Sequence, residues 1–203
     1  LEDTELEDFI NKLRNEEIHG INVTVPFKNK VIKYLDKLSL EVESTDSVNT
    51  IYKSGKDIVG HNTDVAGFEL GLRHSKINVL HKSILILGAG GVVPSIIYSL
   101  LSMGCKKIYL SNRTISKAED IKNKFNEIEI LKWGKIPDFD IVINATSVGL
   151  KGDSLDIEFN VKDKVFYDVI YNPKETHFLK KAKENGNKIE TVSYTHLRAH
   201  ETG

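Results

Sequence analysis

The chain contains little cysteine, methionine, tryptophan and proline, and it has no long apolar run. There are one Cys, one Met, one Trp and four Pro among 203 residues. The single cysteine, Cys105, cannot form a disulfide within the chain, which excludes a disulfide scaffold and favours the reducing cytoplasm. No apolar run approaches the roughly 20 residues of a membrane-spanning helix, so we expect no membrane partner.

Charge of neither sign is in excess. The 28 Lys and Arg residues nearly balance the 29 Asp and Glu residues, which leaves a formal net charge of −1. No global field therefore attracts nucleic acid or an anionic surface, and we expect no nucleic-acid partner. With 40% hydrophobic and 28% charged residues, the composition is that of a globular protein of one or two domains.

The most informative stretch runs from residue 84 to residue 92. Four consecutive apolar residues, 84–87, predict a buried parallel strand, and a helix is expected over 92–102. Glycines between them would let the pyrophosphate of a dinucleotide approach the backbone N–H groups at the helix start. The predicted cofactor-binding residues of this turn are Gly88, Ala89, Gly90, Gly91 and Val92. Val93 departs from the motif, since it stands where the third glycine is usual.

Strands and helices alternate from Ser83 onward. Strands are expected at 84–87, 107–110, 140–144, 164–168 and near 188–191, and helices at 92–102, 115–125 and 176–185. This alternation predicts an α/β fold with a doubly wound parallel sheet, a Rossmann-type dinucleotide-binding domain over residues 81–192.

The first part of the chain, residues 1–80, has a different pattern and is predicted to form a separate α/β domain. Its expected elements are helices at 4–15 and 31–38, a strand at 21–25, a hairpin at 48–60 and a helix from 64 to 74. Asp64 is in a position to cap the last of these helices.

The end of the second Rossmann strand indicates which cofactor is bound. Enzymes that prefer NAD usually carry an acidic residue here for the ribose 2′-hydroxyl, whereas an arginine accommodates a 2′-phosphate. This chain has Asn112, Arg113 and Thr114, with Lys117 one turn further on, which predicts NADP. That Arg113 and Lys117 are merely solvated surface charges remains an alternative. The loop containing Thr146 follows the strand that ends near Asn144, so it should face the nicotinamide.

Seven short motifs, in this order, closely resemble those of the shikimate dehydrogenases. They are Asn22–Lys28, Ser47–Thr50, Gly60–Asp64, Gly88–Val92, Asn112–Thr114, Asn144–Gly149 and Asp168–Pro173. The resemblance extends from about Ile18 to Ile189 and therefore covers most of the chain. It implies that residues 1–80 bind the substrate and that NADPH reversibly reduces 3-dehydroshikimate to shikimate, a step of aromatic amino-acid biosynthesis.

The resemblance also implies roles for individual residues. Lys28 and Asp64 match the catalytic pair, and an ammonium group at Lys28 could stabilise charge on the carbonyl oxygen and supply its proton. Both also match substrate contacts, as do Thr24, Asn49 and Tyr171. Val169 stands near the nicotinamide, where relatives often carry Met.

Other functions remain open at this stage. One alternative is a quinate/shikimate dehydrogenase that uses NAD, although Arg113 argues against it. A catalytically silent regulatory protein of the same fold is a second, and the presence of both Lys28 and Asp64 argues against that. A third alternative is a Rossmann oxidoreductase that acts on a tetrahydrofolate or a tRNA-linked substrate. Such an enzyme would not need the motifs at Asn49 and Asn62, which argues against it. The protein is expected to be a monomer or a homodimer.

The two ends of the chain depart from the family. The family's first strand would lie before Leu1, and residues 193–203 match nothing in its C-terminal part, so we expect a truncated chain with an artefactual tail. His196 and His200 have the i, i+4 spacing of a metal site but no third ligand, and no metal is predicted. Such a chain should bind NADPH but oxidise shikimate poorly.

Overall fold

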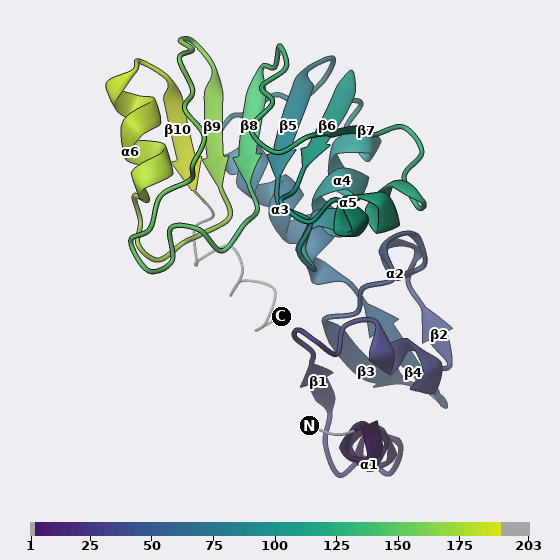
Figure 1. Ribbon diagram of the computed structural model, residues 1–203. Helices are drawn as coiled ribbons and strands as arrows, with labels where there is room; N and C mark the ends of the chain where they lie inside the picture. Colours follow the sequence, from purple (N-terminus) through teal and green to yellow (C-terminus); the bar gives the residue numbers. More distant parts are fainter. Residues whose placement is uncertain (1–2, 192–203) are drawn as a thin grey trace. The chain divides into compact units, whose positions relative to one another are not determined.

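The computed structural model describes residues 3–191 and separates into two compact units, Leu1–Ala66 and Gly67–Gly203 (Figure 1). The division falls within helix α3 (Thr63–His74), because Phe68 and Leu72 are buried in the apolar core of the second unit. The domain boundary between residues 80 and 81 stays a prediction. The predicted tail with His196 and His200 lies outside the described residues.

The first unit is built on a four-stranded mixed sheet with the strand order β1-β3-β4-β2. Its elements are α1 (Asp3–Arg14), β1 (Gly20–Asn22), the 3₁₀ helix η1 (Lys30–Tyr34), β2 (Lys37–Leu38), α2 (Leu40–Thr45), β3 (Thr50–Ser54) and β4 (Asp57–His61). Strands β3 and β4 form the predicted hairpin, which turns at Gly55 with φ of +63°. Ile10 and Leu13 of α1 are buried against Ile51 and Ile58 of the hairpin, which forms the core of this unit.

Two local predictions for this unit were wrong in part. The helix expected at 31–38 is only the short η1, after which Leu38 pairs with Gly60 as part of a parallel strand. Apolar residues at helical spacing are compatible with this arrangement, because Leu35 and Leu38 pack, partly buried, against the core of this unit without being in a helix. The strand expected at 21–25 ends at Asn22, since the chain turns where Phe27 N–H donates to the Thr24 carbonyl. The 40–45 helix was not predicted.

The second unit is a six-stranded, all-parallel sheet with the order β10-β9-β8-β5-β6-β7 (Figure 1). The strands are β5 (Ser83–Leu87), β6 (Lys107–Ser111), β7 (Glu129–Leu131), β8 (Ile141–Asn144), β9 (Val165–Asp168) and β10 (Lys188–Thr191), and the helices between them are α4 (Val93–Ser102), α5 (Ile115–Lys122) and α6 (His177–Glu184). In chain order this arrangement is 3-2-1-4-5-6, the order of a dinucleotide-binding Rossmann domain, as predicted. Only β7 was not expected.

Helices cover both faces of this sheet. On one face Ile84 and Ile86 pack with residues of α3, α4 and α5, and on the other Leu85 and Leu87 pack with residues of α6. Strand β5 is therefore buried on both sides, which explains its uninterrupted apolar run. Within residues 3–191, no helix is long and apolar enough to cross a membrane.

Candidate active site

Lys28 and Asp64 form an ion pair in the first unit. Lys28 Nζ lies 2.6 Å from Asp64 Oδ2, and each side chain is only 17% exposed. Lys28 follows the turn after β1, and its carbonyl accepts from the N–H of Val48. Asp64 lies in the first turn of α3. The sheet therefore brings together the two residues that the resemblance names as the catalytic pair.

Asn49 holds the carboxylate of Asp64 in place, and Asn62 holds its backbone N–H. The side-chain amide of Asn49 donates to Asp64 Oδ1 at 3.0 Å and to Thr63 Oγ1 at 2.9 Å, and its oxygen accepts from the Thr63 N–H at 2.9 Å. Asn62 Oδ1 accepts from the Asp64 N–H at 3.0 Å. Asn62, and not Asp64, therefore caps the start of α3, and the Asp64 carboxylate is left to face Lys28.

The two other predicted substrate residues are exposed. Thr24 lies in the turn between β1 and Lys28, in the same unit as the ion pair. Tyr171 follows β9 in the second unit and is 46% exposed. The contacts of both residues with a substrate stay predictions.

The glycine turn lies between β5 and α4. Gly88 has φ of +106°, and a Cβ atom there would be 2.7 Å from the carbonyl oxygen of Ala145. Gly90 and Gly91 are exposed, and no side chain caps the start of α4 at Val92. A helix start with uncapped N–H groups and a close-packed glycine fits a pyrophosphate.

The departure at Val93 is accommodated within the second unit. Its side chain is fully buried in the apolar core, while Ala89 and Val92 pack against the same core. Pro94 lies in the first turn of α4, where its missing N–H removes no helical hydrogen bond. The turn therefore keeps its shape without the third glycine.

Arg113 is already paired in this structure. Its guanidinium donates to Asp156 Oδ1 at 3.0 Å and lies 5.3 Å from the ring of Trp133, whose Nε1 donates to the same oxygen at 3.0 Å. The hydrogen bond from Trp133, followed by that from Arg113, lowers the pKa of Asp156. Because Asp156 is 43 residues from Arg113, no local pattern pointed to this pair.

Three further predicted NADP residues, Asn112, Thr114 and Lys117, lie near Arg113 in the sequence, beyond the end of β6. The Asn112 amide donates to the Thr114 carbonyl at 2.7 Å, and Thr114 is the residue that precedes α5. Lys117, in the first turn of α5, is exposed. Two exposed cations, Arg113 after β6 and Lys117 in α5, thus lie within one short stretch of chain.

The loops after β8 and β9 are joined by buried hydrogen bonds. Thr146 donates to Asn144 Oδ1 through both its N–H and its hydroxyl, at 3.2 and 2.7 Å. The amide of Asn144 donates in turn to the carboxylate of Asp168. Val169, next in the chain, packs against the core on the same face as α4. Sequence reasoning placed Asn144 and Asp168 in motifs but assigned neither of them a role.

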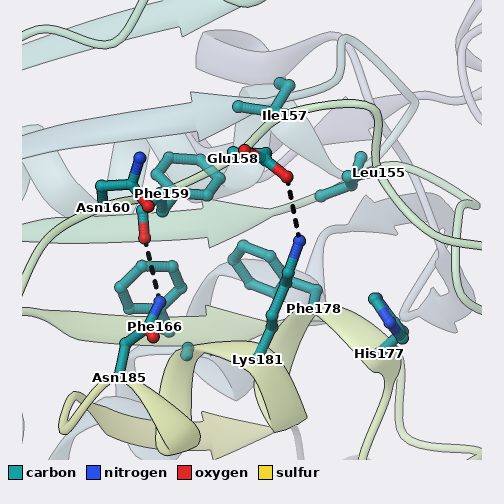
Figure 2. Close-up of a pocket in the computed structure, with 11 residues that line it drawn as sticks. Leu155, Ile157, Glu158, Phe159, Asn160, Phe166, His177, Phe178, Lys181 and Asn185 are labelled. Carbon is teal, nitrogen blue, oxygen red and sulfur yellow. Dashed lines mark hydrogen bonds and ion pairs between the residues drawn. The ribbon is translucent and has the colours of Figure 1, made fainter.

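A separate small cavity lies beside α6 (Figure 2). Its volume is about 140 Å³, and it is lined by Phe159, Phe166 and Phe178 among others. Lys181 donates to Glu158 at its edge at 3.4 Å. None of the predicted site residues lines this cavity. Among residues 3–191, no cluster of three His, Cys, Asp or Glu side chains could hold a metal.

Two family descriptions match the chain. "Shikimate dehydrogenase substrate binding domain" matches residues 1–51, and "Shikimate / quinate 5-dehydrogenase" matches residues 71–150. The chain is 56% identical over 189 residues to a shikimate dehydrogenase (NADP(+)) of Pelagibacter ubique. The matched residues cover 92% of this chain and 71% of the relative.

Solved structures show the same fold. The shikimate 5-dehydrogenase of Listeria monocytogenes, in complex with shikimate and NAD, is 29% identical with a TM-score of 0.85, over 95% of this chain and 73% of that one. The shikimate 5-dehydrogenase of Thermus thermophilus, in complex with NADP(H) and shikimate, is 28% identical with a TM-score of 0.78. This match covers 94% of the present chain and 71% of the Thermus chain. With its ion pair, its Rossmann sheet and these similarities, the chain belongs to the shikimate dehydrogenase family.

Proposed function

We propose that this protein is an NADP-dependent shikimate dehydrogenase that catalyses the reversible reduction of 3-dehydroshikimate to shikimate. The observation that carries the proposal is the part-buried ion pair of Lys28 and Asp64, within a chain whose relatives have this name. The reaction adds a hydride to a ketone carbon and a proton to its oxygen. NADPH, when bound, supplies the hydride.

Lys28 supplies the proton in this proposal. Its ammonium group has three hydrogens, of which one is directed at Asp64 Oδ2, so others can point at the carbonyl oxygen of the substrate. A positive charge at that point also stabilises the negative charge that develops on the oxygen. Asp64, held by Asn49, fixes the direction of Lys28 and balances its charge.

Two features of the second unit support NADP as the cofactor. The glycine turn and the uncapped start of α4 would hold the pyrophosphate, and Gly88 leaves no room there for a side chain. Arg113 and Lys117 would hold the 2′-phosphate, with Asn112 and Thr114 beside them. Thr146 and Val169 would line the nicotinamide side. NAD is the second candidate, and Arg113 disfavours it because NAD has no 2′-phosphate.

Thr24, Asn49 and Tyr171 would bind the hydroxyl and carboxylate groups of the substrate, as the resemblance implies. A ring bearing several hydroxyl groups is well matched by such polar groups, because analogues that lack a hydroxyl leave them unpaired. We also propose that the enzyme works in the cytoplasm, where NADPH and a reduced Cys105 would both be maintained.

A single substitution in a full-length version tests the proposal. Lys28→Ala should lower kcat for shikimate oxidation by about 10²–10⁴-fold, the usual contribution of a general acid, while NADPH binding is unchanged. Lys53→Ala is the matched control, because Lys53 also pairs with a carboxylate in this unit, Glu16, at 2.7 Å. Turnover by Lys28→Ala close to that of the control would remove Lys28 from the mechanism. A silent regulatory protein would show no turnover in any of the variants.

A further inference from the structure

Asp168 is a fully buried carboxylate at the end of β9. Its side chain accepts from the Asn144 amide at 3.2 Å to each oxygen, from the Ile170 N–H at 3.0 Å and from the Thr176 hydroxyl at 2.7 Å. Asp168 and Asn144 are 0% exposed and Thr176 is 1% exposed. All three donors are neutral, and within residues 3–191 no ion pair involves Asp168.

Burying a carboxylate without a cation costs free energy, which only good hydrogen bonds offset. Burial raises the pKa of Asp168, while its bonds from Thr176, Ile170 and Asn144 act in the opposite direction. A neutral or apolar residue could end this strand at less cost. The carboxylate therefore needs an explanation beyond the stability of the sheet.

The first explanation lies in the loop after β8. Because Asp168 accepts from the amide nitrogen of Asn144, the amide oxygen of Asn144 must point the other way. That oxygen accepts from both the N–H and the hydroxyl of Thr146, and the Thr146 hydroxyl accepts from the Val148 N–H at 3.1 Å. The carboxylate thus determines the orientation of one amide, and that amide determines the shape of the loop.

The second explanation lies at the glycine turn. The Ala145 N–H donates to the Leu87 carbonyl at 2.8 Å, and the Ala145 carbonyl oxygen lies 2.7 Å from the position that a Cβ atom of Gly88 would take. The loop that Asn144 orders is therefore packed directly against the turn that is to receive the pyrophosphate. A shift of this loop would move atoms on both sides of the cofactor site.

The third explanation lies after β9 itself. The bond from Ile170 N–H fixes the backbone between Val169 and Tyr171, and Thr176 caps the start of α6 by accepting from the Leu179 N–H at 3.4 Å. The same carboxylate thus joins the ends of β8 and β9 and the start of α6. Parallel strands bind their ligands at these carboxyl ends.

We propose that Asp168 is a positioning residue, a buried acceptor that sets the loops after β8 and β9 in the arrangement that binds the cofactor. The NADPH-binding test of this proposal rests on the proposed function, whereas its test by amide hydrogen exchange does not. Asp168 acts through Asn144 and Ile170 and touches no reacting atom.

The test exchanges the acceptor and the donor. Asp168→Asn would bring its own amide N–H₂ against that of Asn144, so the Kd for NADPH should rise by about tenfold, on the scale of an unsatisfied buried donor. The double variant Asn144→Asp with Asp168→Asn restores a carboxylate facing an amide, and its oxygens can still accept from Thr146, but the Val148 carbonyl loses the bond that the Asn144 amide donates at 3.3 Å. We therefore expect it to recover part of the lost affinity, with a Kd below that of Asp168→Asn.

A buried polar residue just before β10, in the same unit, provides the control. Asn187 is 7% exposed and bonds to Lys164, Val161 and Ala182 near the start of β9, at the opposite end of that strand. Asn187→Ala should lower the melting temperature while leaving the NADPH affinity unchanged. If it weakens NADPH binding as much as Asp168→Asn does, the effect is general destabilisation and the proposal is overturned.

Amide hydrogen exchange makes the result independent of the cofactor. In Asp168→Asn the amides of Thr146, Val148 and Ile170 should exchange faster, and the double variant should restore their protection. Unchanged exchange in Asp168→Asn, or no rescue of exchange in the double variant, overturns the proposal. This readout does not need the cofactor. Absence of NADPH binding by the unmodified chain would instead refute the proposed function. If Asp168→Asn does not fold, Thr176→Val replaces it as the test variant. Thr176→Val should raise the exchange rates of the same amides by a smaller factor, whereas Thr176→Ser, which keeps the hydroxyl, should not. Equal exchange rates in the two Thr176 variants would count against the proposal.

Discussion

The guanidinium of Arg113 and the carboxylate of Asp156 are 3.0 Å apart, on a segment that follows β6 and a segment that precedes β9. Both side chains are more than half exposed, at 57% and 62%. The arginine expected to bind the 2′-phosphate of NADP therefore already has an anionic partner. An exposed pair of this kind is weak, so a phosphate with more negative charge can compete for the same guanidinium.

Arg113→Ala should weaken NADPH binding by about 1.5–3 kcal/mol, the scale of hydrogen bonds to charged groups. NADH binding should be nearly unchanged, because NADH has no 2′-phosphate. Fluorescence titration with the two reduced cofactors measures both values. Equal losses for NADPH and NADH would mean that Arg113 supports the fold instead of the phosphate.

Asp156→Asn provides the opposite arm of this experiment. The amide oxygen can still accept from Trp133 Nε1, but the negative charge near the expected phosphate is gone. NADPH should then bind more tightly, by less than about fivefold because the pair is exposed, and NADH should be unaffected. Weaker NADPH binding in this variant would show that Asp156 serves to hold Arg113 in its binding position.

Asn49→Asp should lower kcat more than Asn49→Ala. The alanine removes the donor to Asp64 Oδ1, whereas the aspartate places a second carboxylate where that donor was, 3.0 Å from the first. Like charges at this distance repel, which would draw Lys28 away from the substrate. Steady-state kinetics of shikimate oxidation in full-length variants compares the two. Equal kcat values, with only KM raised, would assign Asn49 to substrate binding alone.

Gly88→Ala should destabilise the protein more than Gly134→Ala. Both glycines have positive φ, +106° and +84°, so a side chain at either position is strained by about 1–3 kcal/mol. Only at Gly88 would the new Cβ also meet backbone, 2.7 Å from the Ala145 oxygen, because nothing lies within 4 Å of the same position at Gly134. Urea unfolding measures the difference. Equal losses would show that the turn at Gly88 has room to move.

Asp140→Asn should change how stability depends on pH. The N–H of Ser83, at 2.9 Å, is the main cause that lowers the pKa of Asp140, with Lys82 contributing. A carboxyl group whose folded pKa is lowered stabilises the protein above its unfolded pKa of about 3.9, and this stability is lost as the pH falls further. The variant should be less stable at pH 7 and should approach the unmodified protein below about pH 4.

Urea unfolding at several pH values provides this measurement. Asp138→Asn is the control, because its side chain is 100% exposed and, within residues 3–191, its one ion pair is long, 3.5 Å to Lys164. A constant difference between Asp140→Asn and the unmodified protein at every pH would rule out the carboxylate as its source.

Local patterns predicted most of the second unit. The four apolar residues at 84–87 are buried on both faces of the sheet, and such a run is typical of parallel strands covered on both faces. In the first unit the same reasoning was less successful. Leu35 and Leu38 have helical spacing, yet Leu38 lies in a strand beside Gly60. Spacing shows that a side chain is buried but does not show which element buries it.

The sequence by itself determined the Rossmann alternation, the glycine turn and the motifs that identify the family, because each depends on residues that are close together in the chain. Only the tertiary structure decided which side chains meet. Asn144 and Asp168 are 24 residues apart, and Arg113 and Asp156 are 43 residues apart. The first pair meets because Asn144 and Asp168 are register partners in neighbouring parallel strands. Hydrogen bonds of this kind are set by strand order and register, which the packing of the whole sheet decides and no short stretch of sequence can encode.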